Sequence, residues 1–195
     1  MGTLTVQTLQ APTSGPNANK VLIPSGHTLD VSPGTLSTSV GQLVQEVIGQ
    51  TSSYTTTSST SYVATNLQVT ITPKFANSLL RLNYNGLISG QNTSAIMTFK
   101  FFDVTNSTNV GFSSLGTGSG RTFGNASFRN KDHDANDRVH LNMTTYQSAS
   151  NTTARTYGIY AQIEGSNTIY ANMTTTDNAG CSYVPPVFTI EEIAQ

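Results

Sequence analysis

The sequence predicts an all-β protein: an antiparallel, jelly-roll-like β-sandwich preceded by an extended N-terminal arm. Three observations support this fold class. From residue 61 onward, short runs place an apolar residue at every second position, which is the period of a half-buried strand. Turn-forming residues separate these runs, and no ten-residue window carries the apolar stripe and caps of a helix. The apolar pieces of the first 60 residues are too short to build a core.

The alternating runs are expected to form strands with one apolar and one polar face. They lie at residues 67–72, 80–84, 97–101, 139–143, 157–163, 169–173 and 187–190. Their Thr, Tyr, Val, Ile and Phe residues also suit a pleated surface better than a helix. The side chains expected to face inward are Leu80, Leu82, Phe99, Phe101, Leu141, Ile159 and Ile163. Residues 164–167, Glu-Gly-Ser-Asn, stand between two runs and predict a hairpin.

Residues 1–60 are predicted to be an assembly arm and linker, and residues 61–195 the sandwich domain. Prolines at four positions divide the arm into short apolar pieces that cannot bury themselves. Such a segment is either disordered or ordered by something outside itself, such as neighbouring subunits. In the second case the expected anchors are Leu4, Val6, Val21 and Ile23. The Ser- and Thr-rich residues 51–61 predict a linker or an edge strand that enters the sandwich.

Charge is scarce along the chain. Only 10% of the residues are Asp, Glu, Lys or Arg, and the net charge is −1, so no field would gather nucleic acid. No apolar run approaches the roughly 20 residues that span a bilayer, and no membrane insertion is expected. Eight Tyr and eight Phe indicate a folded protein whose surface is built of hydroxyl and amide groups. Cys181 is the single cysteine, so no disulfide or cysteine metal site is expected within one chain.

One dense charged cluster, residues 131–138, raises the question of a metal site. Asp132, Asp134 and Asp137 supply oxygen ligands of the kind that Ca²⁺ takes. Asp137 and Met143 stand where an EF-hand needs Gly and Glu, so that motif is excluded. A looser calcium loop remains an alternative, but a solvated turn with paired charges is the favoured interpretation. We therefore expect no bound metal and no cofactor.

The residues that could catalyse a reaction are dispersed. His27 lies in the arm, His133 in the charged cluster, and His140 on the polar face of a predicted strand. No serine stands in a Gly-x-Ser-x-Gly elbow. Paired carboxylates for glycoside hydrolysis are the enzymatic alternative that the sequence leaves open. We expect that the protein is not an enzyme.

Distinctive phrases occur in the arm, in the first two predicted strands and at the C-terminus. They are Lys-Val-Leu-Ile-Pro-Ser-Gly-His-Thr-Leu-Asp-Val at 20–31, Ser-Ser-Thr-Ser-Tyr-Val at 58–63, Val-Thr-Ile-Thr-Pro at 69–73 with Ser-Leu-Leu at 78–80, and Ile-Glu-Glu-Ile-Ala-Gln at 190–195. Together they resemble virion proteins of tailed bacteriophages of aquatic bacteria. Lys74 departs from the family phrase because it comes early, before the strand at 79–84. The resemblance carries over no catalytic residue.

The resemblance implies a virion structural protein, a tail fibre, head fibre or capsid decoration protein, commonly a homotrimer that contacts other tail or capsid proteins. A fibre-type component, which attaches through the arm and displays the sandwich to host-surface glycans, is our first hypothesis. The expected loop at 113–138, with Phe123 and Phe128, favours it as an aromatic tip. A decoration (cement) protein that clamps the shell is the alternative, favoured by the long arm. A glycan-degrading enzyme is the remote alternative.

Overall fold

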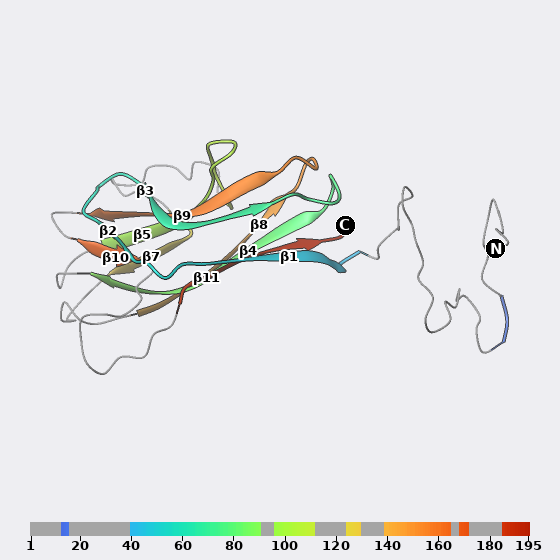
Figure 1. Cartoon of the computed structure of the whole chain (residues 1–195), viewed down its shortest axis with the longest axis horizontal. Helices are drawn as coiled ribbons and strands as arrows, with labels where there is room; N and C mark the ends of the chain where they lie inside the picture. Colours follow the sequence, from blue (N-terminus) through green and yellow to red (C-terminus); the bar gives the residue numbers. More distant parts are fainter. Residues whose placement is uncertain are drawn as a thin grey trace. The chain divides into compact units, whose positions relative to one another are not determined.

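Strands account for all the regular structure in the part of the chain that the structure describes. The computed structural model describes residues 13–15, 40–90, 96–111, 124–129, 139–164, 168–171 and 185–195. The strands form two antiparallel sheets that pack against each other (Figure 1), which confirms the predicted antiparallel β-sandwich. Within these ranges, no helix is long and apolar enough to cross a membrane.

The first sheet is built around the long strand β4. Its order is β1-β11-β4-β10-β2, and β8 also pairs with β4. Its members are β1 (Leu43–Gln50), β2 (Thr55–Thr57), β4 (Leu79–Gly90), β8 (Val139–Ser148), β10 (Ile169–Ala171) and β11 (Val187–Ile193). Because β4 is twelve residues long, it can pair with β11 along its first half and with β10 at its end.

The second sheet has the order β3-β9-β5-β6, and β7 also pairs with β5. Its members are β3 (Val63–Ile71), β5 (Ile96–Asp103), β6 (Thr108–Asn109), β7 (Ala126–Arg129) and β9 (Arg155–Glu164). The strands β5 and β9 lie at its centre, and both carry buried residues on their outer as well as their inner faces. The outer face of this sheet is therefore partly covered by other segments of the chain.

Alternate residues of the facing strands fill the space between the sheets. All seven side chains that the sequence predicts to face inward are buried, with exposed fractions of 8% or less. Tyr84, Tyr157 and Phe188 complete the core, and the Phe101 and Phe188 ring centroids lie 5.5 Å apart between the two sheets. Full burial of such side chains contributes about 1.5–3 kcal/mol each. The predicted core is therefore confirmed.

The sandwich begins earlier than the predicted boundary at residue 60. Strand β1 pairs with β11, and β2 pairs with β10, so both belong to the first sheet. Of the two predictions for residues 51–61, the edge strand is the one observed. The alternation of apolar and polar residues fails in β1 because two of its inward positions carry no apolar side chain. Gln45 hydrogen-bonds the buried Glu192, and Gly49 has no side chain. A Cβ atom at Gly49 would lie 2.4 Å from Val69 Cγ2, so only glycine fits there.

Two further predictions need correction. Residues 164–167 do not close a hairpin, because β9 lies in the second sheet and β10 in the first. The chain passes from one sheet to the other between β9 and β10. Turn-forming residues are typical of both a hairpin and such a crossing, so the sequence does not distinguish them. The expected loop at 113–138 contains β7, where Phe128 packs against the core and is not part of an exposed tip. Phe123 lies outside the described residues.

Candidate interaction surfaces

The outer face of the first sheet carries mainly polar side chains. Antiparallel pairing aligns Glu46, Glu191, Arg81 and Tyr146 in one row across β1, β11, β4 and β8. The next row contains Ile48, Thr189, Asn83 and Thr144. Neighbouring side chains in such rows are close enough to interact directly. We refer to these eight residues as the outer face of the first sheet.

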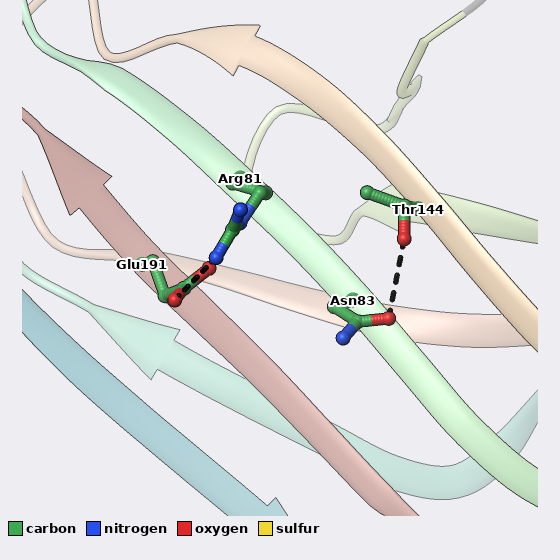
Figure 2. Close-up of polar contacts among 4 residues, drawn as sticks. All are labelled: Arg81, Asn83, Thr144 and Glu191. Atoms are coloured by element: carbon green, nitrogen blue, oxygen red, sulfur yellow. Dashed lines mark hydrogen bonds and ion pairs between the residues drawn. The ribbon is translucent and has the colours of Figure 1, made fainter. Parts of the chain in front are cut away.

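An ion pair neutralises the centre of this face (Figure 2). Arg81 Nη2 donates to Glu191 Oε1 at 2.6 Å, and Arg81 Nε contacts Glu191 Oε2, so the guanidinium grips the carboxylate with two nitrogens. The hydrogen bond and the charge of Glu191 raise the pKa of Arg81, with a smaller contribution from Tyr146. Beside the pair, Thr144 Oγ1 donates to Asn83 Oδ1 at 3.2 Å. Apart from Ile48 and the carboxylate of Glu46, the face therefore presents hydroxyl and amide groups around one neutralised ion pair.

A second cluster lies on the outer face of the second sheet, around Lys100. Its Nζ lies 4.2 Å from the Tyr62 ring centroid, 4.7 Å from that of Phe102 and 5.9 Å from that of Tyr160. The same ammonium donates to Asn109 Oδ1 at 2.7 Å. Lys100 is only 8% exposed, so its ammonium has lost most of its contact with water. The aromatic faces and the amide oxygen replace part of that hydration.

The contacts of this Lys100 cluster indicate a structural role, in which they hold two strands of the second sheet together. Burial lowers the pKa of Lys100, while the aromatic faces attract its cationic form. Burial also raises the pKa of the Tyr62 hydroxyl, which therefore stays protonated near neutral pH. Tyr62 immediately precedes β3, whereas Lys100 lies in β5, so the contact holds the start of β3 against the outer face of its own sheet. Tyr62, Phe102 and Tyr160 remain partly exposed around the cation.

A buried carboxylate joins three segments at the opposite face of β11. Glu192 is fully buried, and its oxygens accept hydrogen bonds from the backbone N–H groups of Lys74 and Phe75, each at 2.9 Å. Ser78 Oγ donates at 2.7 Å and Gln45 Nε2 at 2.6 Å. The carboxylate thus joins β1, β11 and the β3–β4 connection. These contacts are internal, so we assign Glu192 a structural role.

Neither the alternative calcium ligands nor the expected arm anchors belong to the part of the chain that the structure describes. Asp132, Asp134 and Asp137 lie outside the described residues, and so do Leu4, Val6, Val21 and Ile23. Among the residues that are described, no group of three or more His, Cys, Asp or Glu side chains could hold a metal ion.

No pattern in the sequence predicts the Lys100 cluster. Alternation in residues 97–101 places Lys100 on a polar face, but nothing connects it with Tyr62. The burial of Glu192 can be predicted from the sequence, because the alternation of Phe188 and Ile190 places residue 192 on the inward face. Its hydrogen-bond donors come from segments remote in sequence and could not be foreseen.

No protein-family model matches the sequence, and no curated protein matches it.

Proposed function

We propose that the chain is a structural component of a bacteriophage virion, of the fibre type, and that its sandwich contacts host-surface glycans. The observation that carries the proposal is the outer face of the first sheet. Arg81 and Glu191 pair on this face, Glu46 adds one carboxylate, and Asn83, Thr144 and Thr189 supply an amide and two hydroxyls. Tyr146 is 51% exposed beside them. Amides and hydroxyls can exchange hydrogen bonds with sugar hydroxyls, and an exposed aromatic ring offers an apolar platform.

The resemblance of the arm to phage virion proteins supports the proposal that the chain is part of the virion. A low-charge surface also suits a protein displayed at high density, because it limits nonspecific attraction to charged surfaces. In this proposal the arm attaches the chain to other virion proteins, and the sandwich is held outward. The role requires binding and assembly but no catalysis.

A cell-binding assay tests the proposal. Labelled full-length protein should bind host cells and compete with adsorption of the phage. The double variant Asn83→Ala, Tyr146→Ala should weaken binding about tenfold, because interface energy concentrates in a few aromatic and hydrogen-bonding side chains. The matched control is Thr70→Ala, Thr156→Ala, which removes a 2.8 Å hydroxyl contact from the outer face of the other sheet.

The outcomes separate the hypotheses. Binding that Asn83→Ala, Tyr146→Ala weakens and that the control leaves unchanged supports the proposal. Binding to phage shells that lack the protein, with no binding to host cells, would contradict it and favour the decoration role. Release of reducing sugar from host polysaccharide by the purified protein would favour the enzymatic alternative.

A further inference from the structure

The outer edge of β1 has the properties of an unfilled docking site for a strand. Among the described residues, β1 pairs on one side only, with β11. In an antiparallel strand, alternate residues direct their N–H and C=O groups to the other side, where they remain available to a partner. Ile48 and Leu43 are 56% and 53% exposed, and Val40, just before the strand, is 77% exposed. Three of the five large exposed apolar residues of the described part therefore lie at this strand.

Three other sheet edges in the described part, those of β2, β6 and β3, are protected in ways that β1 is not. The edge strands β2 and β6 are only three and two residues long. The longer β3 has a register shift between Ala64 and Gln68, and within it the Asn66 N–H donates to Thr55 Oγ1 at 3.0 Å. Short strands, irregularities and covering segments are the usual protections of an edge.

The edge of β1 lacks most of these protections. Its register shift, between Leu43 and Gln45, leaves the remainder of the strand regular. It contains no proline or lysine, and Glu46 is its one charged residue. β8 is the other long edge of the first sheet, and it serves below as the comparison.

We propose that residues 3–10 of a second copy of the chain add as a strand to the outer edge of β1. This segment, Thr-Leu-Thr-Val-Gln-Thr-Leu-Gln, is eight residues long, the same length as β1. It contains no glycine, proline or charge, so it can supply a continuous ladder without repelling Glu46. The other apolar pieces of the arm fit less well, because Pro24 and Pro33 interrupt them and Asp30 would add a negative charge.

The connection to the sandwich is long enough for exchange between copies. Residues 11–42 can span about 100 Å when extended, which exceeds the dimensions of a small domain. If each copy gives one arm and receives another, the contact is head-to-tail and can close a ring, as a trimer requires. The inference rests on the proposed assembly role of the arm, and it names the surface that receives the arm.

Disulfide trapping between two differently marked populations of the full chain tests the inference, with Cys181→Ser as the background. One population carries a single arm cysteine, in turn Leu4→Cys, Thr5→Cys, Val6→Cys or Gln7→Cys, and the other carries Ile48→Cys. After co-expression and mild oxidation, a disulfide that joins the two populations must connect different chains. The matched control replaces Ile48→Cys with Tyr146→Cys, which is similarly exposed but lies on β8.

We expect at least one arm position to give roughly tenfold more mixed disulfide with Ile48→Cys than with the control, because strand pairing raises the local concentration. Equal yields with both partners, or none at any arm position, would overturn the inference. A third sample carries the arm cysteine and Ile48→Cys in the same chain. Crosslinks found only within such chains would also overturn the inference, because the arm would then cover its own sandwich. If the protein binds cells but forms no mixed disulfide, the strand exchange is contradicted and the proposed function is not. If the mixed disulfide forms but the protein does not bind cells, only the glycan-binding role is contradicted.

Discussion

Glu192 shows how a single side chain joins distant segments. Desolvation on burial acts to raise its pKa, but the hydrogen bonds from Lys74, Ser78, Phe75 and Gln45 outweigh that effect and hold the pKa below its usual value. The unfolded chain therefore binds a proton at a higher pH than the folded protein does. The resulting stabilisation is present above the unfolded pKa and is lost as the pH falls through the folded pKa.

The first prediction concerns this carboxylate. Glu192→Gln should lower the free energy of unfolding by about 1–3 kcal/mol near pH 7, because an amide nitrogen would face donors that need an acceptor. As the pH falls through the ordinary glutamate pKa of about 4.3 and below it, the wild type should lose more stability than the variant. Urea denaturation at each pH measures both effects. Glu191→Gln, on the outer face of the same strand, is the control, and identical pH profiles for Glu192→Gln and wild type would contradict the assignment.

The second prediction concerns the aromatic core. Phe99 is fully buried, so Phe99→Ala should lower the free energy of unfolding by about 3–5 kcal/mol through lost burial and a residual cavity. Tyr146→Ala, at an exposed position, should change it by only about 0.5 kcal/mol. Guanidinium denaturation of the three proteins provides the comparison. Similar losses for both variants would show that the two side chains are not differently buried.

Among the strands, the close approach of β1 to β3 depends on Gly49, which has no side chain. A Cβ at Gly49 would lie 2.4 Å from Val69 Cγ2 and 3.3 Å from the Gln68 carbonyl oxygen. Such distances force the strands apart, because neither a valine methyl nor a backbone carbonyl can move far. Gly49 therefore sets how closely the edge strands of the two sheets can pack.

The third prediction follows from this contact. Gly49→Ala should destabilise the protein by about 1–3 kcal/mol through overpacking. Val69→Ala should also destabilise it, but the double variant should be more stable than the sum of the two losses predicts, because the smaller side chain makes room. A double-mutant cycle from denaturation curves measures the coupling. Strictly additive losses would mean that the two residues do not compete for space.

Sequence patterns identify the elements of this protein unevenly. Strands β4, β5 and β9 could be predicted because they alternate over many residues against a buried face. Strands β1, β2 and β7 could not, since each is short or lies at an edge where tertiary contacts override the pattern. The crossing after β9 and the Lys100 cluster depend on contacts between segments remote in sequence. Local residue types therefore predict which face of a strand is buried, but not which strand lies beside it.

At the scale of the whole molecule, the sandwich offers two different kinds of surface. The outer face of the first sheet carries mainly polar groups, whereas the edge of β1 offers backbone groups, with the exposed side chains of Leu43 and Ile48 beside them. The first suits contact with a host, and the second suits assembly of identical copies. A fibre component needs both. This combination is why we propose a fibre-type component and not a simple adhesion domain.

The position and copy number of the chain in an electron-microscopy map of the phage particle test the central proposal most directly. We expect sandwich-shaped density in sets of three around a symmetry axis, with the outer face of the first sheet toward solvent and the arm directed into the particle. Sandwiches present as isolated single copies would contradict the trimer and the fibre assignment. Complete particles with no density for the chain would contradict its role in the virion.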